Sequence, residues 1–238
     1  MREVEKDKTF DTWTRDELLN HFGLKSRKQC DLLDEWLAME TTVTELECQV
    51  LDIYRTKAEV LIDTWKEADL RDNFLGPVIS LANLYSEDLH YTTFSESYLT
   101  TNYNSIPLRG NVEWMVAMGF ENPRTPLFFI HEYKPSVGGN DAKGQLLSGM
   151  MAAATLNRNP SDKYAPYRWI EVDGDMPVYG CTIIGQFWWF GALHNDEYCF
   201  SKAYDAVNRE ELIEIFRILK AQKTIIARQI QKMTIANV

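Results

Sequence analysis

The most informative segment for predicting the fold of this chain is Leu127-Phe128-Phe129-Ile130-His131-Glu132-Tyr133-Lys134. It is a short apolar run, rich in phenylalanine and bounded by two prolines, which predicts a buried β-strand. Because side chains on a strand alternate between its two faces, we expect Glu132 and Lys134 to point the same way and Tyr133 to point the other way. A carboxylate and an amine buried together destabilise a fold unless they pair or hold something, such as a metal ion beside a phosphate.

The segments around this strand predict a mixed α/β domain. Strands are expected at 91–103, 111–118, 127–134, 178–184, 187–193 and 198–200, and helices at 142–156 and from about 209 to the end. The first hundred residues read as mostly helical. This order of helices, three strands, a helix, further strands and a helix is typical of a mixed β-sheet flanked by helices.

The N-terminal helices are predicted from their start signals. Capping boxes, in which a threonine is followed three residues later by a glutamate, are expected to open helices after Thr14, Thr44 and Thr64. Another helix is expected over about 26–39. Pro77 should kink or divide the helix that Thr64 opens, because proline cannot donate the hydrogen bond that a helix interior requires.

The helix after Thr44 carries an apolar stripe. Its members recur at spacings of three and four, which is the pattern of an amphipathic helix that needs another surface to cover it: Leu46, Val50, Ile53, Lys57, Val60 and Leu61. We therefore expect residues 1–63 to form a helical region that serves as a homodimer or partner arm. Residues 64–238 are expected to form the α/β domain.

The composition argues against several classes of protein. The net charge of −10 disfavours a protein that coats nucleic acid without specificity, and no apolar run approaches the ~20 residues that span a bilayer. The first residues lack the apolar stretch of a signal peptide, so we expect a cytoplasmic protein that does not bind membranes. The widely spread Cys30, Cys48, Cys181 and Cys199 predict free thiols in a reducing cytoplasm and argue against a structural zinc site.

A third polar residue, Glu113, lies on the predicted strand before the turn. If the two strands form a hairpin, Glu113 approaches Glu132, and two nearby carboxylates raise a pKa or recruit a cation. Carboxylate oxygens suit Mg²⁺ or Mn²⁺, which retain several waters and meet a substrate phosphate. Lys134 would then orient the attacking water and stabilise developing negative charge.

This arrangement resembles the PD-(D/E)xK nuclease-like superfamily, which shares the restriction-endonuclease-like fold. An acid on one strand is followed by Glu-x-Lys on the next and by a helix that carries Gln145 near its start. The likeness covers about 64–193. The phrases Phe-Phe-Ile-His-Glu-Tyr-Lys-Pro and Gly-Gln-Leu-Leu-Ser-Gly-Met-Met-Ala-Ala resemble those of uncharacterised bacterial members. The motif alone is short, and the surrounding strands and helix give it its specificity.

The resemblance implies a role for each matching residue. Glu113 and Glu132 would bind Mg²⁺ or Mn²⁺, with help from the backbone carbonyl of Tyr133. Lys134 would position the attacking water. Gln145 would help to arrange the site from the helix that follows.

Some positions depart from the pattern or extend it. Glu113 stands where the superfamily usually has aspartate, and Val112 stands where its name places proline. Glu67, near the start of the domain's first helix, matches the place where some members carry an additional acid.

Simpler interpretations stand beside these. Glu132 and Lys134 can be a salt bridge at the end of an edge strand, and Gln145 can be a surface helix residue. Of the adjacent Trp188 and Trp189, we expect one to enter the core and the other to face a neighbouring element, in preference to an aromatic platform for bases.

The function that fits best is a metal-dependent nuclease that hydrolyses phosphodiester bonds, in DNA rather than RNA. The main alternative is a catalytically inactive protein that keeps the nuclease fold for binding or assembly. A different phosphoryl-transfer or nucleotide-binding enzyme is a third possibility, for which the sequence offers no phosphate-binding loop motif.

Overall fold

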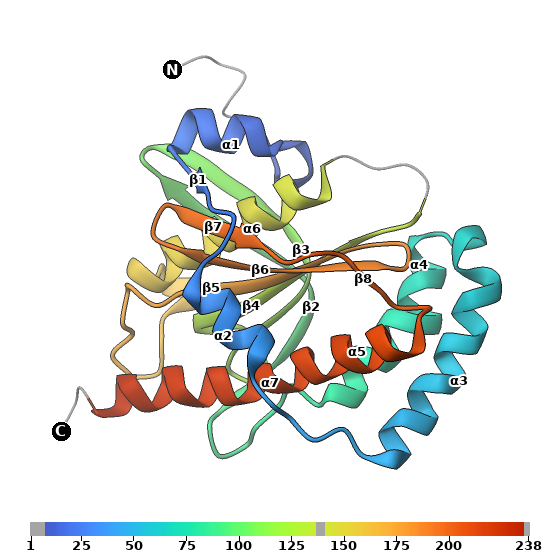
Figure 1. The fold of residues 1–238 in the computed structure, drawn as a ribbon. Coiled ribbons are helices and arrows are strands. Elements are labelled where there is room, and N and C mark those ends of the chain that lie inside the picture. The colour runs from blue at the N-terminus through green and yellow to red at the C-terminus, as the bar shows by residue number, and fades with distance from the viewer. Residues whose placement is uncertain (1–7, 137–140, 236–238) are drawn as a thin grey trace.

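A mixed eight-stranded β-sheet forms the centre of the molecule, as a computed structural model that describes residues 8–136 and 141–235 shows (Figure 1). The strands follow the order β1-β7-β6-β5-β4-β3-β2, and β8 pairs with β6. Their bounds are β1 Lys25–Ser26, β2 Tyr91–Tyr103, β3 Ile106–Met118, β4 Arg124–Lys134, β5 Val178–Ile184, β6 Phe187–His194, β7 Glu197–Phe200 and β8 Tyr204–Asp205. The predicted α/β class and the predicted strands are confirmed.

Strand β4 lies inside the sheet and determines how the chain runs. It pairs antiparallel with β3 and parallel with β5. A short turn can join antiparallel strands, but a parallel pair needs a crossover connection, usually a helix. Helix α6 (Ala142–Arg158) makes this crossover, packs against β4 and β5, and is buried along almost its whole length.

Helices cover both faces of the sheet (Figure 1). Helix α6 and, beyond it, α1 cover one face, the α6 face, whereas α7, α2 and α5 cover the other, the α7 face. The further bounds are η2 Phe10–Thr12, α1 Arg15–Phe22, α2 Asp31–Ala38, α3 Glu45–Leu61, η3 Ile62–Thr64, α4 Glu67–Leu70, η4 Arg71–Leu75, α5 Gly76–Ala82, η5 Asp162–Tyr164 and α7 Arg209–Ile235. In the described part of the chain, no helix is long and apolar enough to cross a membrane.

The N-terminal helices belong to the same two hydrophobic clusters as the sheet. Leu18 of α1 lies in the cluster on the α6 face, and Trp36 of α2 lies in the cluster on the α7 face. The Trp36 ring meets Phe129 edge-on at a centroid distance of 5.6 Å, and its Nε1 donates to the carbonyl of Ile218 at 2.9 Å. The expected boundary after residue 63 falls inside η3, and helices on both sides of it contribute to one cluster.

Two of the three predicted capping boxes are confirmed. Thr14 and Thr44 accept hydrogen bonds from the amides three residues later, and α1 and α3 begin there. The box predicted at Thr64 is wrong, because Thr64 belongs to the 3₁₀-helix η3. The next helix instead begins after Lys66, whose amide donates to the Asp69 carboxylate at 3.3 Å.

The helix that contains Pro77 is divided, as predicted. Helix α4 passes into η4, a π-helix of five residues, and α5 then begins with Pro77 in its first turn. Proline has no amide hydrogen and is tolerated in a first turn, where the amide would have no partner inside the helix.

Strand β1 is a short edge strand that the sequence did not predict. Lys25 and Ser26 pair parallel with Glu197 and Tyr198 of β7. Helix α2 consequently begins at Asp31 and not near Ser26, as the sequence suggested. A pairing between segments about 170 residues apart leaves no local signal in either segment.

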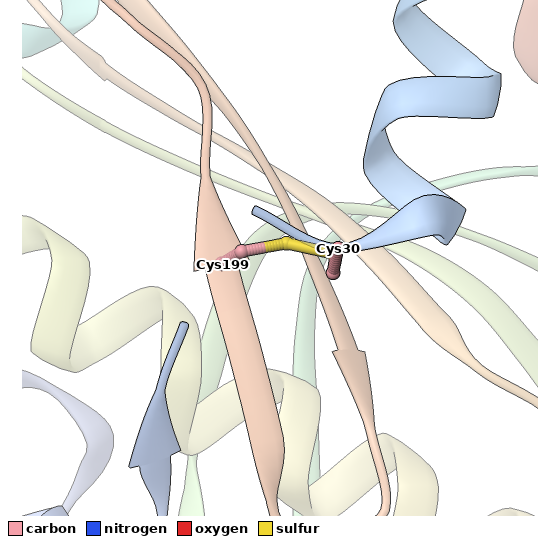
Figure 2. The surroundings of a disulfide bond; sticks show 2 residues. All are labelled: Cys30 and Cys199. Carbon is pink, nitrogen blue, oxygen red and sulfur yellow. A yellow bond between two sulfur atoms is a disulfide. The ribbon is translucent and has the colours of Figure 1, made fainter. Parts of the chain in front are cut away.

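The same pairing brings Cys30 beside Cys199, and the two form a disulfide bond (Figure 2). Cys30 lies at the start of α2 and Cys199 lies on β7. The expectation of four free thiols is therefore wrong for these two residues, whereas Cys48 and Cys181 are free. The spacing of the cysteines could not reveal the bond, because β1, which aligns the two segments, was not foreseen.

We expect the disulfide to stabilise the fold. Unfolded protein should expose two alkylatable cysteines without reductant and four after reduction. Cys30→Ser should lower the free energy of unfolding by roughly 2–5 kcal/mol, because the bond restricts the unfolded chain. Denaturant titration measures this, with the free Cys48→Ser as the control. Four alkylated cysteines without reductant would contradict the assignment.

Candidate functional site

The candidate site lies where strands β3 and β4 separate. Their ladder ends at the pair Trp114–His131, one residue before Glu113 and Glu132. Beyond this point β3 stays paired with β2, and β4 stays paired with β5 as far as Lys134. The two predicted acids therefore flank a fork in the sheet, where backbone hydrogen bonds no longer join the two strands.

Glu132 and Lys134 form a buried ion pair at this fork. The Lys134 Nζ lies 2.9 Å from the Glu132 Oε1, and the two side chains are 16% and 2% exposed. Glu67, at the start of α4, lies 3.8 Å from the same ammonium group. The sequence placed these three residues in one site, and the structure brings them together.

Burial governs the charge of the pair. Burial, and after it the nearby Glu113 and Glu67, raise the pKa of Glu132 from 4.5 to about 8, although Lys134 opposes this shift. Burial alone would lower the pKa of Lys134, but Glu132, Glu67 and Glu113 together raise it. Lys134 is therefore a cation at neutral pH, whereas Glu132 keeps its proton there unless further positive charge lies beside it.

Glu113 forms a hydrogen bond with the side chain of Tyr133. Burial raises the pKa of Glu113, and a hydrogen bond with the Tyr133 hydroxyl lowers it in part. Tyr133 is 2% exposed and packs in the cluster on the α7 face. Its side chain thus contributes to the site, whereas the sequence suggested a role for its backbone carbonyl alone.

Arg71 is a residue of this site that the sequence did not reveal. It lies on η4, and the side chains of Tyr133 and Asp72 hydrogen-bond to it and raise its pKa. Its Nη1 also donates to Glu96 of β2 at 2.8 Å. The one available signal was its spacing of four residues after Glu67, which places both on the same side of a helix.

Several buried oxygens near Glu132 lack hydrogen-bond partners. Among the described residues, the Gln145 Oε1 and the Thr182 Oγ1 make no hydrogen bond, and the Glu132 Oε1 makes none beyond its contact with Lys134. Thr182 pairs in register with Glu132 on the neighbouring strand, so both side chains lie on the same face. Unpartnered buried oxygens are costly, which points to a site that accepts an additional partner.

A cavity connects Glu113 with the helix that follows the motif. It has a volume of about 230 Å³, and Glu113, Gln145, Phe10 and Tyr98 lie in its wall. Gln145 is 6% exposed and lies in the first turn of α6, so it is not the surface residue of the simpler interpretation. The structure therefore places Gln145 and Glu113 around one space.

The oxygen atoms at the fork suit a hard divalent cation. Among the described residues, no group of three or more His, Cys, Asp or Glu side chains is close enough to hold a metal ion. Mg²⁺ nevertheless binds proteins through one or two carboxylates and keeps several waters. Glu113 and Glu132 supply donors of that kind, and Gln145, which lines a cavity together with Glu113, adds an unpartnered amide oxygen.

Comparisons with known proteins add no assignment. No family model matches the chain, and no curated protein matches its sequence. The function is therefore inferred from the geometry of the fork.

We expect the burial of Glu132 to appear in the pH dependence of stability. Its folded-state pKa, about 8, lies above its ordinary value of 4.5, so the folded protein retains a proton that the unfolded chain releases. This contribution is complete below about pH 4.5 and is lost as the pH rises through 8. Glu132→Gln should make the unfolding free energy less pH-dependent across this window, by roughly 3–5 kcal/mol.

Denaturant titrations between pH 5 and 9 measure this difference in slope. Glu121→Gln, at an exposed turn position, is the matched control and should follow the wild type. An identical pH dependence for Glu132→Gln and the wild type would contradict the raised pKa.

Proposed function

We propose that this protein is a metal-dependent nuclease of the restriction-endonuclease-like fold that hydrolyses phosphodiester bonds in DNA. The observation that carries the proposal is the buried Glu132–Lys134 pair beside Glu113 at the point where β3 leaves β4. A structural ion pair alone does not require a second acid or the unpartnered oxygens of Gln145 and Thr182 around it. A site for a cation and a phosphate accounts for both.

Glu113 and Glu132 would hold the metal together with the backbone carbonyl of Tyr133, and Gln145 would contribute from α6. When bound, Mg²⁺ or Mn²⁺ supplies Lewis acidity toward the phosphate and lowers the pKa of a bound water. Burial raises the pKa of Glu132 in the free protein, and a positive charge held beside Glu132 would oppose this effect.

Lys134 acts as a positive hydrogen-bond donor and not as a base. Its raised pKa keeps it protonated at neutral pH, so it cannot accept a proton from water. Its ammonium group orients the attacking water and stabilises the negative charge that develops on the phosphate. Arg71 and Tyr133 act through Glu113 by fixing the position of its carboxylate.

Metal binding and hydrolysis test this function separately. Mn²⁺ titrated into the wild type by calorimetry should bind saturably, and Glu113→Ala and Glu132→Ala should abolish the binding because each removes a ligand. Lys134→Ala should keep the metal but lose at least about 100-fold in the rate of DNA cleavage, since it removes a charge that acts on the transition state.

Glu121→Ala is the control for both measurements, because this side chain is exposed on the turn between β3 and β4, at the opposite end of these strands from the fork. Binding that survives in both acid variants would refute the metal site. A wild type that cleaves neither DNA nor RNA with either metal would refute the nuclease.

One observation favours the alternative, a protein that keeps this fold for assembly. On α3, Leu46, Ile53 and Val60 are 69%, 67% and 75% exposed and recur every seven residues. Leu51 and Ala58 on the opposite side are buried against the domain. This row of exposed apolar side chains is a surface that another helix or a second copy of the chain could cover, which supports the proposed homodimer.

If α3 mediates a homodimer, Ile53→Lys should convert the protein to a monomer in light scattering after gel filtration, because a charge at the centre of the stripe would be buried without a partner. Phe120→Lys, which changes an apolar side chain that is 42% exposed on a turn, is the control. A wild-type protein that is monomeric at high concentration would contradict the hypothesis that α3 mediates a homodimer.

A further inference from the structure

An aromatic platform lies on the α6 face of the sheet, beyond the first turn of α6. Phe187 and Trp189 of β6 form it, with ring centroids 6.2 Å apart. Phe187 is 41% exposed, and Trp189 is partly exposed. The Lys143 Nζ of α6 lies 4.6 Å from the Trp189 ring and 5.1 Å from the ring of Phe200.

The register of the sheet joins this platform to the candidate site. Glu132 pairs with Thr182, which pairs with Trp189. In the next row, Lys134 pairs with Ile184, which pairs with Phe187. Residues paired across a ladder share a face, and neighbouring strands lie about 4.8 Å apart. The backbones of β4 and β6 therefore lie about 10 Å apart along these two pairings, with the ion pair on one strand and the two rings on the other.

Two glycines show that the rings lie on the α6 face. Gly180 and Gly191 form the β5–β6 pair two residues away from Thr182 and Trp189, so all four residues share one face. A Cβ on Gly180 would lie 2.7 Å from the Met150 sulfur of α6, so this row faces α6. Trp189 lies two residues before Gly191 and hence on the same face, whereas Trp188 is buried on the α7 face. One tryptophan enters the core and the other does not, as the sequence suggested.

A cation, Lys143, lies next to the platform. Its ammonium group contacts the Trp189 and Phe200 rings, and among the described residues no carboxylate forms an ion pair with it, although burial lowers its pKa. Asp141, two residues away, already accepts hydrogen bonds from Arg15 at 3.0 Å. The other acid nearby, Asp205 opposite Phe187, accepts hydrogen bonds from Gln186 and from a backbone amide.

We propose that Phe187 and Trp189 stack the bases of a single-stranded nucleic acid whose phosphate lies at the fork. This inference rests on the proposed nuclease function and names its substrate class. Stacking on aromatic rings needs bases that are unpaired and unstacked, which a duplex does not offer. Lys143 contacts the backbone beside the stacked bases, and Lys134 contacts the phosphate at the site. The substrate is therefore a single strand or the frayed end of a duplex, bound without base sequence preference.

Fluorescence anisotropy with a labelled oligothymidylate measures binding without cleavage, using full-length protein and no divalent metal. The wild type should bind the single strand more tightly than a duplex of equal length. Phe187→Ala and Trp189→Ala should each weaken single-strand binding by roughly 5- to 150-fold, because each removes a stacking surface. Phe120→Ala, an aromatic side chain with 42% exposure on a distant turn, is the matched control and should bind as the wild type does.

The outcomes separate this inference from the nuclease function. Thermal melting tests whether each variant is folded. If folded Phe187→Ala and Trp189→Ala bind the single strand as tightly as the wild type does, the proposal that these rings stack the bases is refuted. A wild type that binds duplex and single strand equally would overturn it as well. If the platform variants lose binding while the wild type cleaves no nucleic acid, the platform stands and the nuclease function fails.

Discussion

Strand β4 lies between one antiparallel and one parallel neighbour, and this position determines both the crossover through α6 and the place where β3 and β4 separate. The parallel pair with β5 requires a crossover, and α6 supplies it by packing across the sheet. The antiparallel pair with β3 ends early, which opens the fork. One strand therefore carries Glu132 and Lys134 at the point where β3 diverges from it.

The electrostatics of the fork follow from this geometry. A carboxylate that is 2% exposed beside a single ammonium is poorly solvated, and further acids lie nearby. Proteins tolerate such a group where its instability serves a purpose, as at sites that bind a cation or a substrate. The unpartnered oxygens of Gln145 and Thr182 belong to the same region of the α6 face, and the aromatic rings of β6 continue it outward.

The parts of this picture that local sequence patterns encode were predictable. The apolar run before Glu132, the helix starts at Thr14 and Thr44, and the break at Pro77 are all set by neighbouring residues. Contacts between distant segments were not predictable. These include β1 and the disulfide it aligns, and the pairing that connects Glu132 with Trp189, because each depends on a strand register that only the folded sheet defines. The approach of Arg71 to Tyr133 depends in the same way on how η4 packs against the sheet.

The π-helix η4 between α4 and α5 has a consequence for the geometry of this site. A π-turn holds one residue more than an α-turn, and such turns are frequent at functional sites. Glu67 and Arg71, which reach the fork, precede or begin the π-turn, whereas the core residues Val78 and Ile79 follow it. Removing one residue from η4 would rotate the two halves by about 100° relative to each other. Such a deletion would turn Glu67 and Arg71 away from the fork, and it would also move the buried Leu70, which lies in the same half, out of its core contacts.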